Sequence, residues 1–185
     1  MGVILRSLAR RGQPRSRSAL AIVPAVHQSH ARPFRFAATR NDDFAFEFKW
    51  DGMRAIVALD RGCIRVTSRH GRDFSGHYPE LQELAHAARR QRLLLDGEII
   101  CADVAGKPCF DTLRERIVLR DRNKIAAAAR RAPVMFMVFD LLHANGKDLT
   151  ALAYTERRAR LDDLGLRGRH WETPPSHRID GEMIL

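Results

Sequence analysis

A lysine between two carboxylates is the feature of this sequence that most directly suggests chemistry. Residues 44–54 read FAFEFKWDGMR, in which aromatic and polar residues alternate. Side chains of a β-strand point to its two faces in turn, so Glu47, Lys49 and Asp51 share one face at intervals of about 6.6 Å. That spacing leaves room for a ligand among the three charged groups.

Lys49 could act as a nucleophile only as a neutral amine. The ordinary lysine pKa of about 10.4 leaves few neutral molecules at pH 7, and the neighbouring carboxylates favour the charged form. A bound metal–nucleotide complex would supply both positive charge and an electrophilic phosphorus. On residue types alone, a strand with salt-bridged polar side chains is the simpler alternative.

The other face of the same segment carries four aromatic residues. Phe44, Phe46, Phe48 and Trp50 form one row, which we expect to lie in the core. The polar row is then either an ordinary solvated face or the lining of a site.

Positive charge is concentrated at the start of the chain. The 185 residues have a formal net charge of +10. Residues 1–41 contain eight Arg and no acidic residue, whereas residues 42–185 carry 24 basic and 22 acidic side chains, a net of +2. We expect residues 1–41 to be a largely disordered basic extension, which either holds phosphates without specificity or is solvated and functionally silent.

Cysteine and histidine usage excludes several classes of site. Cys63, Cys101 and Cys109 form no C-x-x-C pair, which argues against a disulfide framework or a zinc site and for a reducing compartment. The eight His lack the H-x-x-x-H and H-E-x-x-H spacings of helical metal sites. No apolar run is long enough to cross a membrane.

Hydrophobic periodicity predicts both strands and helices. We expect strands over residues 44–50, 54–59, 63–68 and 134–142, and a strand over 93–101 that is interrupted at Asp96-Gly97-Glu98. Helices are predicted from Pro79 to about Ala88, over 111–118 and 122–131, and from a cap at Thr155 to a stop at Gly165. Hairpins and helices without regular β-α-β alternation indicate an α+β fold with largely antiparallel sheets.

Several short motifs then occur in an order typical of one enzyme family. Residues 49–54 fit K-x-D-G-x-R, residues 68–73 fit S-R-x-G-x-D, residues 96–98 are D-G-E, and residues 139–142 are F-D-L-L. Residues 154–158 and 171–175 resemble stretches that follow in bacterial end-joining ligases. Residues 42–185 thus resemble the adenylation domain of ATP-dependent DNA ligases. The resemblance implies a nucleotidyltransferase (ATP-grasp-like) fold of antiparallel sheets flanked by helices.

The resemblance implies a covalent role for Lys49. This residue would attack the α-phosphate of ATP, expel pyrophosphate and hold AMP through a phosphoramide bond, storing an activated phosphate for a second transfer. AMP would then pass to the 5′-phosphate of a DNA nick, and the adjacent 3′-hydroxyl would displace it.

The resemblance to ATP-dependent DNA ligases also implies which residues would bind the nucleotide. Glu47 would help to recognise the adenine, and Phe139 would stack on its face. Arg54 and Arg69 would hold ribose and phosphate oxygens, which suits guanidinium geometry. Glu98 would contact the ribose or help to place Mg²⁺ (or Mn²⁺), which shares the charge of the departing pyrophosphate.

The implied partners are nicked or broken double-stranded DNA, and either proteins that bind DNA ends or a complementing C-terminal fragment. The implied setting is DNA repair or recombination in the cytoplasm, at the nucleoid.

The family pattern continues with E-G-x-x-x-K and K-x-K motifs and an OB-fold domain. None of these is found before Leu185, and the second D-G-E, at residues 180–182, has no lysine after it. We therefore expect residues 42–185 to be an incomplete adenylation domain and the OB-fold domain to be absent. Two alternatives stay open: a non-catalytic remnant that binds nucleotide or DNA, and an RNA ligase or capping-type nucleotidyltransferase.

Overall fold

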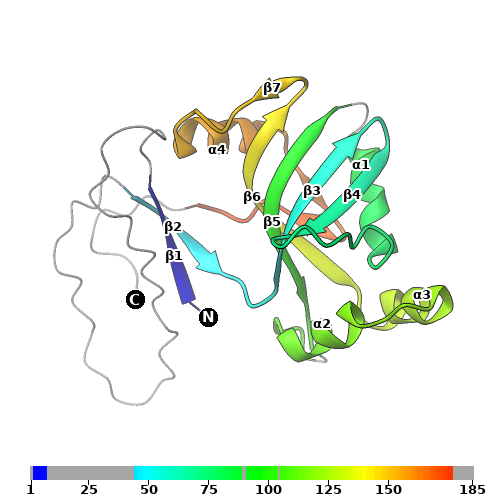
Figure 1. Ribbon diagram of the computed structural model, residues 1–185. Coiled ribbons are helices and arrows are strands. Elements are labelled where there is room, and N and C mark those ends of the chain that lie inside the picture. Colours follow the sequence, from blue (N-terminus) through cyan, green and yellow to red (C-terminus); the bar gives the residue numbers. More distant parts are fainter. Residues whose placement is uncertain (1, 8–43, 89–90, 104, 177–185) are drawn as a thin grey trace, which may run out of the picture.

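A seven-stranded sheet forms the centre of the molecule (Figure 1). The computed structural model describes residues 2–7, 44–88, 91–103 and 105–176. The strand order is β4-β3-β5-β6-β9-β8, with β7 paired to β6. The strands are β3 (Met53–Asp60), β4 (Cys63–Ser68), β5 (Leu93–Cys101), β6 (Val134–Ala144), β7 (Lys147–Asp148), β8 (Arg167–Gly168) and β9 (Trp171–Glu172).

The sheet is largely antiparallel, as the sequence predicted, but one parallel strand pair makes it mixed. Five of its strand pairs are antiparallel, but β9 runs parallel to β6, with Phe136 opposite Trp171. The connection from β6 to β9 contains a helix, and a helical crossover allows a returning strand to lie parallel.

Strand β5 continues through Asp96-Gly97-Glu98, where the sequence predicted an interruption. All three residues pair with β3 on one side and β6 on the other, with an irregularity in the β6 register between Asp96 and Gly97. A Cβ atom at Gly97 would lie 2.4 Å from the Met137 carbonyl oxygen. The glycine is therefore needed where two strands of the sheet approach closely. It does not mark a turn, as the Asp-Gly sequence had suggested.

Helices pack against the sheet close to where the sequence predicted them. A short 3₁₀ helix, η2 (Pro79–Leu81), leads into α1 (Gln82–Ala87). It is followed by α2 (Phe110–Ile117), α3 (Arg122–Arg131) and α4 (Tyr154–Asp163). Figure 1 shows α2 and α3 together at one end of the sheet and α4 near β6 and β7 at the other.

The start of α4 differs from the prediction that Thr155 caps it. The helix begins at Tyr154, and the N-cap is Ala153, whose backbone N–H donates to Glu156 Oε2 at 3.0 Å. The Glu156 carboxylate therefore accepts a hydrogen bond from a backbone N–H at the start of the helix, and no hydroxyl side chain caps it. Gly165, with φ of 57°, stands beyond the C-terminal end as predicted.

A second, two-stranded sheet contains the segment around Lys49. Strand β2 (Phe44–Lys49) pairs antiparallel with β1 (Gly2–Ser7), with Gly2 opposite Lys49. Residues 2–7, expected to be disordered with the rest of 1–41, thus form a strand. The remainder of that segment lies outside the described residues, as does the second D-G-E at 180–182.

The prediction that the aromatic row of β2 is core is wrong at its end. The exposed fraction of Phe48 is 44%, and Trp50 is half-buried, whereas Glu47 on the opposite face is only 5% exposed. Strand β2 does not pair with the seven-stranded sheet, so the burial of its faces is decided by packing against α4 and not by apolarity. The side chains of Phe44 and Phe46 lie outside the description.

The main core lies between the seven-stranded sheet and its helices. It contains Val57, Leu95, Ile99 and Phe136 from the strands, and Tyr78, Leu81, Leu84, Leu113 and Leu161 from the segments packed on them. No helix in the described part of the chain combines the length and apolarity that crossing a membrane requires.

Candidate functional site

Glu98, in the middle of β5, is the centre of a cluster of charged side chains. Burial raises the pKa of the Glu98 carboxyl to about 7; the charges of Asp96 and Asp51 add to this rise, while those of Arg54 and Lys49 oppose it. Lys49 is exposed at the end of β2, but it is close enough to act on Glu98. The fold therefore brings Lys49, Asp51, Arg54 and Glu98 together from segments up to 49 residues apart.

Arg54 is held in place by a two-point contact with Asp96. Its Nε lies 3.0 Å from Asp96 Oδ1 and its Nη2 lies 2.5 Å from Oδ2. Arg54 is opposite Glu98 in the β3–β5 register, and its side chain is 44% exposed whereas that of Asp96 is 7% exposed. The buried carboxylate thus fixes the orientation of the guanidinium, and the exposed part of the guanidinium remains accessible to a ligand.

Phe139 lies beside the same guanidinium. The Cζ atom of Arg54 is 5.5 Å from the centroid of the Phe139 ring, and Phe139 itself is only 6% exposed. Phe139 is therefore part of the cluster, while its stacking on a base stays a prediction.

Asp140, which follows Phe139, joins β6 to α4. Arg157 donates to it twice, from Nε at 2.8 Å and from Nη2 at 2.7 Å, and also donates to the Leu152 carbonyl at 2.7 Å. Asp140 faces Asp96 across the β5–β6 register. Two neighbouring buried carboxylates thus each have an arginine of their own, as buried charges require.

Glu47 is buried against α4 and is not open on the Lys49 face. The Tyr154 hydroxyl donates to Glu47 Oε1, and Arg158 Nη1 lies 3.4 Å from the same oxygen. Burial, followed by the charge of Glu47, raises the pKa of Tyr154 to about 12. Arg158 also donates to the Pro174 carbonyl and, at 2.9 Å, to Asp162. Glu47 thus anchors β2, and its contact with adenine stays a prediction.

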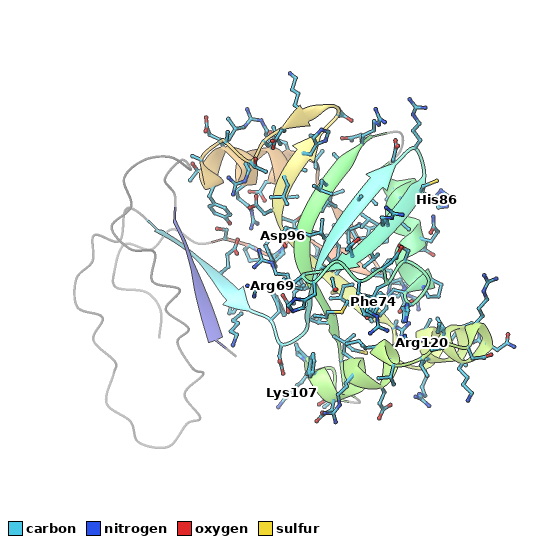
Figure 2. All side chains as sticks on the ribbon, viewed as in Figure 1. Arg69, Phe74, His86, Asp96, Lys107 and Arg120 are labelled. Carbon is cyan, nitrogen blue, oxygen red and sulfur yellow. The ribbon has the colours of Figure 1, made fainter. Side chains whose placement is uncertain are left out.

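Arg69 stands at the edge of this cluster. It lies in the turn after β4, where the Gly71 N–H donates to the Ser68 carbonyl at 2.9 Å, and its side chain is exposed (Figure 2). Within the described residues its side chain makes no hydrogen bond or ion pair, so no polar contact links it to Arg54 or Glu98.

A cavity of about 430 Å³ is lined by neighbours of the cluster residues, but by none of Lys49, Arg54, Glu98 and Phe139 themselves. It is lined by Trp50, which follows Lys49, by Ile100, two residues beyond Glu98, and by Met137, the register partner of Glu98. That volume lies within the range of small-molecule sites.

The sequence missed four residues of this arrangement: Asp96, Asp140, Arg157 and Arg158. The sequence does contain a signal for them. An aspartate within a strand that is otherwise apolar is expected to be buried and therefore to need a cationic partner, and the adjacent arginines 157–158 could supply one. No group of three or more His, Cys, Asp or Glu that could hold a metal occurs among the residues that the structure describes.

The chain is similar to known DNA ligases. The family described as "ATP dependent DNA ligase domain" matches residues 27–184. The multifunctional non-homologous end joining DNA repair protein LigD of Mycobacterium tuberculosis is 36% identical over 128 residues, which cover 69% of this chain and 15% of the relative. DNA ligase C of the same organism is 36% identical over 121 residues, covering 65% of this chain and 33% of the relative.

Solved structures give the same result. The ligase domain of Mycobacterium tuberculosis LigD matches with a TM-score of 0.55 and 36% identity, over 65% of this chain and 36% of that chain. A mycobacterial DNA ligase D complexed with ATP and MES matches to the same extent. The chain spans only a part of each relative, but the family match covers most of its own length, from residue 27 to residue 184: this chain belongs to the ATP-dependent DNA ligase domain family.

Proposed function

We propose that residues 42–185 bind ATP and form a covalent lysyl-AMP at Lys49, as the adenylation part of an end-joining DNA ligase. The observation that carries this proposal is the grouping of Arg54, Glu98 and Phe139 on three adjacent strands. Lys49, at the end of β2, is near enough to lower the pKa of Glu98. The similar mycobacterial DNA ligase D complexed with ATP supports the choice of nucleotide.

In the proposed reaction, the neutral amine of Lys49 attacks the α-phosphorus of ATP. The Nζ–P bond forms as the bond from phosphorus to the pyrophosphate oxygen breaks, and the amine proton passes to solvent. Covalent storage of AMP divides the overall reaction into two easier transfers. AMP then moves to a DNA 5′-phosphate, and the adjacent 3′-hydroxyl displaces it and joins the strands.

The other side chains would bind and orient the nucleotide. Arg54, pre-oriented by Asp96, and Arg69 hold ribose and phosphate oxygens. Phe139 stacks on the adenine, and Glu47 contributes to adenine recognition in addition to anchoring β2. Fixing the nucleotide in this way converts a bimolecular attack into an effectively unimolecular one.

Glu98 and Asp51 are suited to a divalent cation that keeps its waters and phosphate ligands. Mg²⁺ is commonly bound by one or two carboxylates together with substrate phosphates, and a cation beside Glu98 would relieve the mutual repulsion of its acidic neighbours. Mg²⁺, or Mn²⁺, supplies charge neutralisation for the departing pyrophosphate. Glu98 would hold the ion or the ribose, and Asp51 would stand beside it.

The proposed acceptor is nicked or broken double-stranded DNA, in end joining with proteins that hold DNA ends. The relatives' names concern non-homologous end joining and DNA repair, which supports DNA over RNA as the acceptor.

The direct test is covalent labelling with ATP. The purified chain is incubated with ATP labelled at its α-phosphate and Mg²⁺, alone and with the C-terminal part of a relative's ligase domain, and is then separated under denaturing conditions. We expect label on the wild-type chain and on the Lys147→Ala control, which removes an exposed lysine of β7, and none on Lys49→Ala. Label that persists in Lys49→Ala would exclude Lys49 as the nucleophile, and absence of label on the wild type in both mixtures would exclude the proposed reaction.

A further inference from the structure

A row of aromatic and cationic side chains lies outside the nucleotide site, between the turn after β4 and the end of α2. The Cζ atom of Arg72 is 4.6 Å from the centroid of the Phe74 ring. The Phe74 ring contacts the His77 ring at 4.8 Å between centroids, and His77 Nε2 lies 3.1 Å from Arg120 Nη1. We refer to Arg72, Phe74, His77 and Arg120 as the basic corner; Figure 2 labels Phe74 and Arg120 on the side of the molecule toward α3.

Unlike Arg116, Arg157 and Arg158, which form ion pairs in the fold, the two arginines of the basic corner have no carboxylate partner among the described residues. Among the described residues, neither Arg72 nor Arg120 has a carboxylate oxygen within 4.0 Å, although both are exposed. The nearby Asp73 carboxylate instead accepts the N–H and the hydroxyl of Ser75, at 2.8 and 2.6 Å.

The surroundings of His77 show that positive charge dominates here. Burial lowers the pKa of His77, and the charges of Arg120, Arg72 and Arg116 lower it further, whereas Asp73 opposes the change. Arg116 is itself neutralised by a buried ion pair with Glu80. A neutral imidazole therefore accepts from Arg120 and fixes it, while the guanidinium keeps donors directed to solvent.

The start of α3 extends the same charge. Asp121 caps this helix through the Lys124 N–H at 2.9 Å, and Arg122 and Lys124 are exposed in its first turn, which contains no acidic residue. Cations in the first turn oppose the helix dipole, so stability does not explain their presence. Local choices that disagree with the fold are typical of functional surfaces.

We propose that the basic corner and the first turn of α3 bind the phosphate backbone of duplex DNA, outside the nucleotide site. This rests on the proposed function, which makes DNA the acceptor. Guanidinium groups suit phosphate oxygens, and contacts of this kind position a protein on DNA without reading its sequence. Residues 42–185 are otherwise nearly balanced in charge, so cations gathered over two adjacent elements fit an extended polyanion better than a single small anion.

The test compares two double variants of the full chain. Arg72→Gln/Arg120→Gln removes both cations of the corner. The matched control, Arg61→Gln/Arg160→Gln, removes two exposed arginines from the β3–β4 turn and from α4. Binding to a fluorescent nicked duplex is followed by anisotropy at several salt concentrations, and unfolding midpoints are measured to verify that all variants fold.

We expect the corner variant to lower the slope of log affinity against log salt concentration by roughly 1.8, because each phosphate contact contributes roughly 0.9. The control should keep the wild-type slope. Equal effects of the two double variants, or an unchanged slope in the corner variant, would overturn the proposal. So would a slope that changes with duplex RNA but not with DNA.

ATP labelling of the wild-type chain is measured on the same preparations. A wild type that binds DNA through the corner but is never labelled counts against the proposed reaction and not against the corner. If the wild-type chain is labelled but its DNA affinity is unchanged by Arg72→Gln/Arg120→Gln, the result counts against the basic corner alone.

Discussion

At the scale of single residues, the chemistry proposed for this protein depends on charged side chains that lie close together. Glu98 is a carboxyl with a pKa near neutrality, placed between an acidic pair and two cations. Perturbed titration of this kind is typical of functional sites, because the arrangement that suits a ligand is unfavourable without it. Arg54 is also prepared for a ligand, because Asp96 holds its guanidinium in one orientation while part of the side chain stays exposed.

The pKa of Glu98 leads to a prediction about stability. A carboxyl whose pKa is about 7 when folded and about 4.3 when unfolded binds more protons in the folded state between those values. The free energy of unfolding therefore falls as pH rises through this window, and the loss is complete above about pH 7. Glu98→Gln removes this penalty, so the variant should be more stable than the wild type at pH 8 and equal to it near pH 4.5.

The measurement is thermal unfolding at several pH values. We expect the Glu98→Gln midpoint to exceed that of the wild type by roughly 2–6 °C at pH 8, with the difference shrinking toward pH 5. Glu83→Gln, an exposed carboxyl of α1, is the control and should show no such trend. A difference between Glu98→Gln and the wild type that is the same at both ends of the pH range would contradict the assignment.

At the scale of elements, the strand that ends in Lys49 depends on a helix for its position. Strand β2 pairs only with β1 among the described strands, and Glu47 joins it to α4 through Tyr154 and Arg158. Helix α4 in turn is joined to β6 by Arg157 and Asp140. Helix α4 therefore connects the strand that ends in Lys49 to the strand that carries Phe139.

Arg158→Met tests this connection. The substitution keeps an apolar stem but leaves the Glu47 carboxylate and the Pro174 carbonyl without the guanidinium. Breaking a buried ion pair in this way costs about 3–5 kcal/mol, and amide hydrogen exchange in β2 should accelerate more than in β5. Arg160→Met on the exposed face of the same helix is the control. Exchange in β2 that is equally slow in both variants would show that α4 does not hold the strand.

Gly97 offers a second prediction at this scale. In Gly97→Ala the new methyl group would lie 2.4 Å from both the Met137 carbonyl oxygen and the Phe136 ring, so β5 and β6 must move apart. We expect a loss of about 1–3 kcal/mol or more in chemical denaturation, as for other overpacked sites. Gly76→Ala, where no atom lies within 4 Å of a new Cβ, should change stability little. Similar losses in the two variants would mean that the close strand approach is not a constraint.

At the scale of the whole molecule, the strand residues proposed to bind the nucleotide and those of the basic corner lie on different elements. Glu98 and Phe139 lie on the neighbouring strands β5 and β6, and Lys49 at the end of β2 is near enough to lower the pKa of Glu98. The corner lies between the turn after β4 and the end of α2. Because the two sets share no residue, the proposed nucleotide chemistry and the proposed phosphate-backbone contacts can be altered independently, as the labelling and binding experiments above require.

Much of this arrangement follows from local sequence. The buried runs of β5 and β6, the β3–β4 hairpin and the helix after Pro79 were predicted because alternation, apolarity and turn residues act over a few neighbours. The continuous path of β5 was not, because Gly97 reads as a turn unless the neighbouring strand is known. The burial of Glu47 was missed for the same reason: alternation separates two faces but does not say which face another element covers.

The sequence by itself determined the family, the residue types at Lys49, Arg54, Glu98 and Phe139, and most strand boundaries, since motifs and periodicity are short-range properties. Only the tertiary structure decided which charges meet. Arg54 and Asp96 are 42 residues apart, and Glu47 and Tyr154 are 107 residues apart. Pairings over such separations depend on how strands register and helices pack, and no local pattern encodes them.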